Sequence, residues 1–193
     1  MARTVDPKRY AERREAILSA AYRQFATNGY DRTTTAAICR EAGISSGTFF
    51  HYFPTKLDAL VGVLLAGVET TRGELQRITA ASPGLAAVLN YARVWENDIG
   101  DEHFGGFAGA VGGLPLEPSV AAALDAESSL IAQFIGHHLA AAKKQGELRD
   151  DVAVETLSTW TRWLMDGAAH SAVQGEASSG ELSVAISALL SAR

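Results

Sequence analysis

The chain has 193 residues, 47% hydrophobic and 20% charged, which allows one large domain or two small ones and excludes a disordered protein. Its formal net charge of −5 argues by itself against a nucleic-acid partner. The single cysteine, Cys39, excludes an internal disulfide and a cysteine metal cluster and fits a reducing cytoplasm. It lies within the apolar pattern of a short helix, so we expect a buried structural thiol rather than a redox sensor.

The charge is unevenly distributed along the sequence. Residues 1–56 contain nine Lys or Arg and five Asp or Glu, a net of +4, whereas residues 57–193 contain eight and seventeen, a net of −9. The sequence therefore predicts that only the N-terminal part meets a polyanion. No apolar run approaches the ~18 residues of a membrane span, and the polar, basic N-terminus does not resemble a signal peptide. We expect a cytoplasmic protein without membrane contact.

Apolar residues recur at helical spacing through most of the chain, which predicts an all-α fold. A first helix is expected over residues 10–28, ended by Gly29, because glycine readily adopts the backbone conformation that closes a helix. Thr34 is placed to cap a short second helix over residues 35–42, because its hydroxyl can accept a hydrogen bond from an amide of the first turn. Gly43 then makes a tight turn.

A third short helix is expected to begin at a cap provided by Ser45 or Ser46 and to stop at Pro54. Thr55, with Asp58 three residues later, has the pattern of a capping box that opens a long fourth helix. One apolar stripe is predicted on that helix, formed by Leu57, Leu60, Val61, Leu64, Leu65 and Val68.

The C-terminal part is predicted to consist of further helices. Ser82 and Pro83 look like an N-cap followed by proline at the first helical position of a helix that ends near Asp98. The glycine-rich segment 105–118 is expected to form a weak or broken helix. The last three helices are expected over residues 118–145, 151–174 and 180–192.

The second and third helices form the spacing of a helix-turn-helix, in which the second member enters the major groove of DNA with its N-terminal end. That end would be Ser45, Ser46, Gly47 and Thr48, small residues with hydroxyls that can approach bases and phosphates closely. Phe49 and Phe53 are four residues apart and share a face, which should be the core side. The side chains expected to project towards DNA or its backbone are Phe50, His51, Tyr52 and Lys56.

This region closely resembles the tetracycline-repressor (TetR) family of bacterial regulators. The resemblance covers about residues 10–61 and lies in the ordered segments ILSAAYRQFATNGY (17–30), TTTAAICREAGIS (33–45) and SGTFFHYFPTKLDAL (46–60). It implies a DNA-binding domain over residues 1–54 and an effector-binding and dimerisation domain over 55–193. The implied DNA contacts are Thr34, Ser45, Ser46, Gly47, Thr48, Phe50, His51, Tyr52 and Lys56.

Phe50 departs from the family pattern, which often has tyrosine at this place. The departure removes a hydroxyl that commonly binds phosphate. Either His51 or Tyr52 takes over this contact, or Phe50 packs against a thymine methyl group. The basic residues Arg3, Lys8, Arg9, Arg13 and Arg14 precede the helix-turn-helix, and they either add salt-sensitive affinity for DNA or form a solvated tail.

In the C-terminal part, the resemblance implies an effector pocket and a dimer interface. The penultimate helix has two apolar faces, and the last helix has one, so we expect these two helices to pair with their copies in a homodimer rather than to form only a monomer core. The candidate apolar walls of the pocket are Trp95, Phe104, Phe107, Trp163 and Met165, and its candidate polar contacts are Asn97, Asp98, His103, His137 and Asp166.

We find no catalytic motif, phosphate-binding glycine loop or defensible metal-ligand spacing, so no enzyme and no cofactor or metal is expected. The sequence therefore predicts a dimeric transcriptional regulator, most simply a repressor that a small-molecule effector releases from a double-stranded, pseudo-palindromic operator. The alternatives are an architectural DNA-binding dimer without an effector and a helical enzyme or binding protein with a vestigial head.

Overall fold

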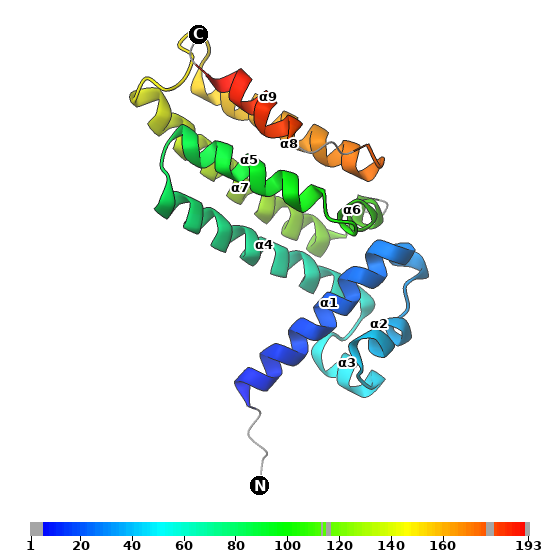
Figure 1. Ribbon diagram of the computed structural model, residues 1–193. Helices are drawn as coiled ribbons and strands as arrows, with labels where there is room; N and C mark the ends of the chain where they lie inside the picture. Colours follow the sequence, from blue (N-terminus) through cyan, green and yellow to red (C-terminus); the bar gives the residue numbers. More distant parts are fainter. Residues whose placement is uncertain (1–5, 113, 115–116, 177–179, 192–193) are drawn as a thin grey trace. The chain divides into compact units, whose positions relative to one another are not determined.

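The computed structural model describes residues 6–112, 114, 117–176 and 180–191, and these form α-helices with an isolated bridge between Leu148 and Ser191 (Figure 1). The all-α prediction is confirmed. Contacts divide the chain into two compact units, one formed by the residues up to Gly67 together with Gly106–Ala123, the other by Val68–Gly105 and the residues from Leu124. None of the described helices is long and apolar enough to cross a membrane.

Helix α1 (Pro7–Arg32) begins at Asp6, whose carboxylate accepts a hydrogen bond from the amide of Lys8 at 3.0 Å. It is interrupted at Gly29 (φ 74°, ψ 165°), where the sequence predicts its end, and then continues to Arg32. The buried hydroxyl of Thr33 closes this segment, because it lies 2.7 Å from the carbonyl oxygen of Gly29 and 2.9 Å from that of Gln24.

Helices α2 (Thr35–Ala42) and α3 (Ser46–Tyr52) lie beside each other and form the predicted helix-turn-helix. The Thr34 hydroxyl accepts from the Ala37 amide at 3.1 Å, and Gly43 between the helices adopts the left-handed conformation (φ 63°, ψ 38°). Glu41 accepts hydrogen bonds from Arg23 and Gln24, so its carboxylate ties α2 to α1. Local capping and this bridge fix the angle at which the two short helices meet.

The core of this unit is formed by α1, α2, α3 and the first turns of α4. Its fully buried side chains include Ile17, Phe25, Ile38 and Phe49. Cys39 is 5% exposed, as expected of a structural thiol. A well-filled apolar core beneath such short helices supplies the stability that they lack in isolation.

Helix α4 (Lys56–Ala81) opens with the predicted capping box. The Asp58 carboxylate accepts from the Thr55 amide at 2.8 Å, and the Thr55 hydroxyl accepts from the Asp58 amide at 3.1 Å. The buried stripe differs from the predicted one at two positions. Leu65, predicted to belong to it, is 46% exposed, and Ala59, which was not predicted, is fully buried.

Helix α5 (Leu85–Ile99) begins after Gly84, and the predicted cap at Ser82 is wrong. Ser82 instead lies just after α4, with its amide bonded to the carbonyl of Ile78 at 2.9 Å. The acceptor for the first turn of α5 is the carboxylate of Glu147, 3.1 Å from the Leu85 amide. A carboxylate 62 residues further along the chain thus does the work that the sequence assigns to a local serine.

Helix α6 (Phe104–Gly112) is a regular helix within the segment predicted to be weak or broken. Gly106 explains part of its glycine content, because a Cβ atom there would overlap the carbonyl oxygen of Ala26. Glycine at this position lowers the helix propensity of α6, but it allows the backbone of α6 to approach the backbone of α1 closely.

The remaining helices are α7 (Pro118–Lys144), α8 (Val154–Val173) and α9 (Glu181–Leu190), close to their predicted bounds. Helix α5 contacts both α8 and α9, which also contact each other. Glu96 of α5 caps α9, its carboxylate accepting from the amides of Leu182 (2.7 Å) and Ser183 (3.2 Å). The core of this unit contains Leu139, Leu157, Ile186 and Leu190. Arg3 and Ala192, named in the sequence analysis, lie outside the described residues.

Candidate DNA-reading surface and effector cavity

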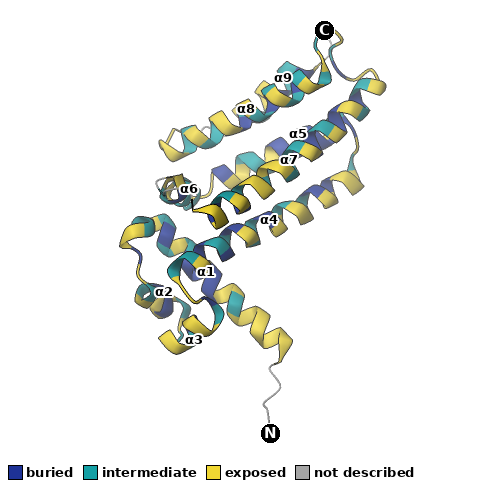
Figure 2. Cartoon of the chain, turned by 180° about the vertical axis from the view of Figure 1, so that it is seen from behind, coloured by how far each residue is buried: buried dark blue, intermediate teal, exposed yellow. Residues whose placement is uncertain are grey.

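The N-terminal end of α3 presents small polar residues to solvent (Figure 2). Ser45 caps the helix, with its Oγ 3.2 Å from the Thr48 amide and 2.9 Å from the Thr48 hydroxyl. Ser46 and Gly47 are exposed. The structure thus selects Ser45 of the two predicted caps. It leaves an accessible helix end with hydroxyl groups beside it, an arrangement suited to phosphate oxygens and base edges.

The aromatic residues of α3 divide as the spacing predicts. Phe49 is fully buried and Phe53 is 4% exposed, so these two rings anchor the helix to the core. Phe50 is 50% exposed, and His51 is exposed as well. Anchoring rings on one side and accessible rings on the other orient α3 with one face towards solvent.

A second aromatic contact, which the sequence analysis did not identify, joins α1 to α3. The ring of Tyr10 stacks on Tyr52 with centroids 4.5 Å apart and meets His51 edge-on at 6.4 Å. Tyr10 is 37% exposed, so it extends the accessible surface of α3. Tyr10 lies seven residues before Ile17, where the first of the matching segments begins, and its polar surroundings give no periodic signal of this role.

Lys56 occupies a different environment from the one predicted. Its ammonium group lies 2.7 Å from the carbonyl oxygen of Tyr30, 2.8 Å from that of Thr33 and 3.4 Å from that of Asp31. It also sits 4.2 Å from the centroid of the Tyr30 ring. All three donors of the ammonium are therefore directed to the end of α1, whereas the role as a phosphate ligand stays a prediction.

The basic residues on the N-terminal turns of α1 are accessible. Lys8, Arg9 and Arg13 are exposed, and the guanidinium of Arg14 lies 5.6 Å from the centre of the Phe53 ring. Thr34, at the start of α2, is exposed too. Positive charge thus lies in the same unit as the accessible end of α3, which is where the sequence places the contact with a polyanion.

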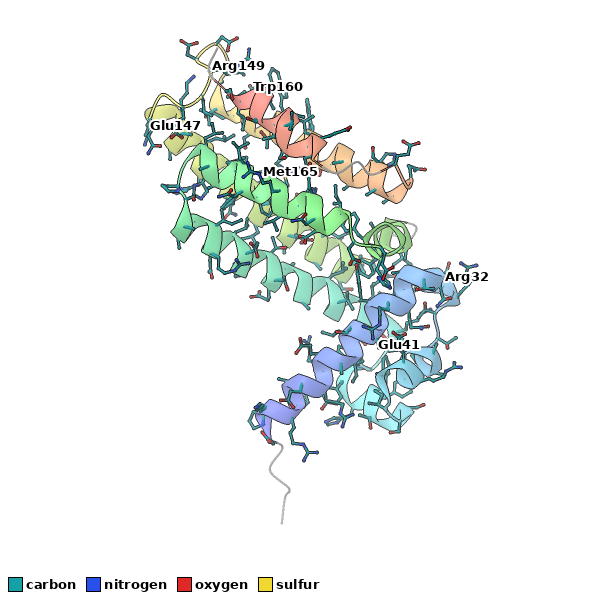
Figure 3. All side chains as sticks on the ribbon, viewed as in Figure 1. Arg32, Glu41, Glu147, Arg149, Trp160 and Met165 are labelled. Carbon is teal, nitrogen blue, oxygen red and sulfur yellow. The ribbon has the colours of Figure 1, made fainter. Side chains whose placement is uncertain are left out.

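In the second unit, a cavity of about 140 Å³ lies between α5, α7 and α8. It brings together three residues nominated from the sequence, Trp95, Met165 and Asp166 (Met165 is labelled in Figure 3). The Trp95 indole nitrogen donates to the Met165 carbonyl oxygen at 3.3 Å, which fixes its ring against the cavity. The other lining residues are Leu124, Glu127, Ser128, Ile131 and Arg162.

The sequence analysis missed the contribution of α7 to this cavity. Leu124, Glu127 and Ile131 follow one another at helical spacing on one face. That spacing is the signal that could have revealed them, although the same pattern is typical of an ordinary core helix. Only the packing of α7 against α5 and α8 distinguishes a helix that lines a cavity from an ordinary core helix.

The other nominated pocket residues lie elsewhere. Phe104 meets the Trp95 ring edge-on at 6.1 Å without lining the cavity, and Phe107 packs on Tyr22 in the first unit at 4.8 Å. Trp163 is 65% exposed, and His137 lines a separate groove between α4 and α7. The nitrogen Nδ1 of His103 lies 3.7 Å from Asp101 and 3.6 Å from Glu102.

Negative charge concentrates beside the cavity. Loss of solvent, followed by the charges of Glu127 and Asp101, raises the pKa of Asp98. Burial, followed by the charges of Glu127 and Asp98, raises the pKa of Tyr91, which keeps its phenol neutral. Glu127 accepts a hydrogen bond from the Thr71 hydroxyl at 2.9 Å. Within the described part of the chain, no three acidic, histidine or cysteine side chains are grouped so as to hold a metal ion.

Comparison with known proteins identifies a family match in the N-terminal part and relatives that extend beyond it. The family model described as "Bacterial regulatory proteins, tetR family" matches residues 17–61. The HTH-type transcriptional repressor AcnR of Corynebacterium jeikeium is 28% identical over 172 residues, which cover 88% of this chain and 86% of that protein. The HTH-type transcriptional regulator HbdR of Aromatoleum sp. is 42% identical over 72 residues, 37% of this chain but only 31% of that relative.

A solved structure shares the fold over nearly the whole length. It is a putative transcriptional regulator from Saccharomonospora viridis in complex with choline, with a TM-score of 0.77 and 23% identity, and the match covers 95% of this chain and all of that one. The helix-turn-helix geometry, the matched family segment and the AcnR similarity through the C-terminal part agree with one another. Residues 17–61 therefore match the tetR family of bacterial regulatory proteins, and over most of its length the chain is similar to a helix-turn-helix transcriptional repressor.

Proposed function

We propose that this regulator acts as a homodimeric repressor and that a small molecule releases it from a pseudo-palindromic operator. The observation that carries the proposal is the accessible, hydroxyl-rich end of α3, where Ser45, Ser46 and Gly47 stand clear of the protein core. In a helix-turn-helix this end meets base edges and the DNA backbone. A protein of this kind acts where the genome lies, which supports a cytoplasmic location.

The proposed DNA contacts fall into two groups. Ser46, Gly47, Thr48 and Phe50 would face base edges, because they occupy the accessible side of α3. The remaining proposed contacts would hold the sugar-phosphate backbone and fix the register of the helix, and they are Thr34, Ser45, His51 and Tyr52. Lys56, whose ammonium faces the carbonyls of Tyr30 and Thr33, would position these contacts without binding phosphate itself.

Operator binding tests the first half of the proposal. Fluorescence anisotropy with a palindromic duplex, against a scrambled duplex of equal length and composition, should give tighter binding to the palindrome. The affinity should fall steeply between about 50 and 200 mM salt, because cationic contacts release counterions from DNA. An affinity that does not depend on salt, or that is equal for both duplexes, would contradict the proposal.

The cavity between α5, α7 and α8 is the proposed effector site. Its volume of about 140 Å³ is smaller than that of typical drug-binding pockets, about 300–1,000 Å³, so we infer a small effector. The Trp95 ring and the carboxylates of Glu127 and Asp166 together favour a cation, because aromatic faces and carboxylates both attract positive charge. Arg162 also lines the cavity, and its guanidinium donates to Ser128 at 3.0 Å.

Choline is a suitable probe, because it is small and cationic and because a protein of the same fold was solved with it. We expect choline to raise the midpoint of thermal unfolding, and 3,3-dimethylbutan-1-ol, its neutral isostere, to have little effect. Glu127→Gln should remove the difference between the two compounds. Equal shifts by both compounds would contradict a cationic effector. If no small molecule changes stability or DNA affinity, the body is only a dimerisation module, as in an architectural DNA-binding protein.

Release of DNA requires that the effector bind the DNA-free conformation more tightly than the DNA-bound one. Helix α4 runs without interruption from Lys56, next to the proposed backbone contacts, to Ala81 in the second unit. We propose residues 1–54 as the DNA-binding domain and 55–193 as the effector-binding and dimerisation domain, with α4 as the element that links the two activities.

The proposed dimer forms through α8 and α9. These helices lie side by side, and each presents a large apolar side chain to solvent, Trp163 at 65% and Val184 at 67% exposure. By contrast, Trp160 of α8 packs on the core of its own unit (Figure 3). Helix-turn-helix dimers read two half-sites about 34 Å apart, so a pair of copies would supply the two recognition helices that a palindrome requires.

A further inference from the structure

A second hollow, distinct from the proposed effector cavity, lies between α4 and α7 in the second unit. It has a volume of about 610 Å³ and shares no lining residue with that cavity. Leu75, Leu130 and Phe134 supply an apolar floor, while Thr79 and His138 supply polar atoms and Arg72 the permanent charge. A mainly apolar hollow with a few polar atoms is typical of small-molecule sites.

The hydrogen bond that Thr79 donates within α4 favours one tautomer of His138. The Thr79 hydroxyl has a single hydrogen, which it donates to the Leu75 carbonyl oxygen at 2.8 Å. The same oxygen lies 3.0 Å from Nε2 of His138, and with the hydroxyl hydrogen assigned to Leu75 the donor at this contact is Nε2–H. In the neutral ring, the other nitrogen, Nδ1, then carries a lone pair and is an acceptor.

This acceptor has no partner among the described residues. His138 is only 2% exposed, and its Nδ1 is buried without a hydrogen bond. The Phe134 ring, whose centroid lies 4.5 Å from that of His138, offers no conventional donor. Burial, followed by the charge of His137, lowers the pKa of His138, so the ring stays neutral at pH 7 and does not satisfy Nδ1 by taking up a proton. Buried acceptors are almost always paired, and this one belongs to a side chain that lines a hollow.

We propose that the α4/α7 hollow is a second ligand site that takes a small, neutral molecule with an apolar or aromatic body and one hydroxyl or N–H donor directed at Nδ1 of His138. A neutral ligand is favoured, because the guanidinium of Arg72 already lies 3.5 Å from the Glu69 carboxylate and none of the described lining residues carries a carboxylate that would attract a cation. The apolar floor accommodates the body of the ligand. This site is independent of the proposed cation-binding cavity.

Phenol and fluorobenzene are a matched pair of probes, because they have similar shapes and only phenol carries a donor. Titration of the full chain with each compound, followed by ¹⁵N NMR of labelled histidines, should show phenol moving the His138 Nδ1 resonance more than any other histidine nitrogen. Phenol should bind about tenfold more tightly than fluorobenzene, the usual worth of one hydrogen bond to a buried group. His138→Phe should abolish this preference, whereas His170→Phe, at an exposed position on α8 that does not line the hollow, should retain it.

Four results would overturn the proposal. They are failure of both compounds to bind, equal affinity for both, a phenol preference that survives His138→Phe, and a wild-type Nδ1 resonance already typical of a protonated or hydrogen-bonded nitrogen. The last measurement uses the unsubstituted protein, so the test holds even if the His138 variant does not fold. Choline binding and operator binding are measured separately. A negative result with phenol therefore contradicts the second ligand site without contradicting the proposed regulatory function.

Discussion

Gly47 is the second residue of α3, and nothing inside the protein requires a glycine there. A Cβ atom at this position would have only Ser45 Oγ near it, at 3.9 Å, an ordinary contact distance. Alanine is the better helix former by up to about 1 kcal/mol, so the glycine costs stability that the fold does not repay. Close approach to DNA gives a reason for it.

We therefore predict that Gly47→Ala leaves unfolding free energy unchanged or raises it by up to about 1 kcal/mol, while it weakens operator binding roughly tenfold. The physical reason is that the added methyl group holds the helix end away from base edges, which costs about 1–3 kcal/mol when a good contact is lost. Denaturant unfolding and anisotropy measure the two effects. Gly67→Ala is the control, because a Cβ atom there meets nothing within 4 Å. If Gly47→Ala binds the operator with normal affinity, the start of α3 does not approach the base edges closely.

Asp98 is a residue whose ionisation opposes folding. Because the pKa of Asp98 is raised in the folded chain above its ordinary value of 3.8, its contribution to stability is fully present below pH 3.8 and is lost as pH rises through the folded pKa. Asp98→Asn should therefore raise the midpoint of thermal unfolding at pH 7, and the gain should shrink as pH is lowered towards 4. Asp125→Asn, an exposed site on α7, controls for the loss of charge. A gain that grows on acidification would contradict this assignment.

At the scale of elements, Lys56 links α4 to the end of α1. Lys56→Met keeps the apolar stem but leaves the carbonyls of Tyr30 and Thr33 without their charged donor. We expect a loss of about 1–3 kcal/mol in unfolding free energy, the usual cost of removing such a partner. Lys8→Met, at an exposed position on α1, should change it by less than about 0.5 kcal/mol.

The same variant separates a structural role from DNA contact. A lysine that binds phosphate contributes about one unit to the slope of log affinity against log salt. Because the ammonium is directed to three carbonyls, we expect the slope of Lys56→Met to equal that of the unsubstituted protein at a temperature where both are folded. A slope reduced by about one unit, with unchanged stability, would restore the phosphate role that the family resemblance implies.

The helix-turn-helix could be predicted from the sequence because its signals are local. Thr34 and Ser45 cap amides three residues away, and Gly43 makes its turn with its own backbone. The start of α5 could not be predicted in this way. The carboxylate that caps it belongs to Glu147, which follows α7, and no residue near Ser82 indicates that this contact forms. Element boundaries set by neighbours distant in sequence carry no local pattern.

The proposed effector cavity follows the same rule. Trp95 and Asp166, which line it, stand out in the sequence because an aromatic ring and a carboxylate are conspicuous residue types, while Glu127 and Ile131 belong to an ordinary amphipathic pattern. Trp163 and Phe107 are equally conspicuous but do not line it, since residue type does not say which face of a helix meets which neighbour. A pocket forms only when helices pack together, whereas the periodicity of one sequence shows only which residues share a face of one helix.

At the scale of the whole molecule, the charge division gains a physical meaning from the fold. The helix-turn-helix lies in the unit that carries the basic N-terminal helix, whereas Asp98, Glu127 and Asp166 lie in the other. Positive charge attracts DNA to one part, while acidic surface elsewhere discourages unspecific wrapping. A net charge of −5 is thus compatible with a DNA-binding protein once its distribution is known.

Dimer formation through α8 and α9 is the remaining whole-molecule prediction. A stable protein interface buries about 1,200–2,000 Å² and has apolar anchors near its centre, a role that the 65% exposed Trp163 fits. Trp163→Glu should convert the dimer to a monomer at micromolar concentration in sedimentation analysis, because two copies of a buried, unpaired carboxylate would face the interface. Operator affinity should fall with it, since a single head reads one half-site. Leu65→Glu, the same kind of change at an exposed position on α4, should leave the dimer intact. If Trp163→Glu sediments as the unsubstituted protein does, the two copies meet through another surface.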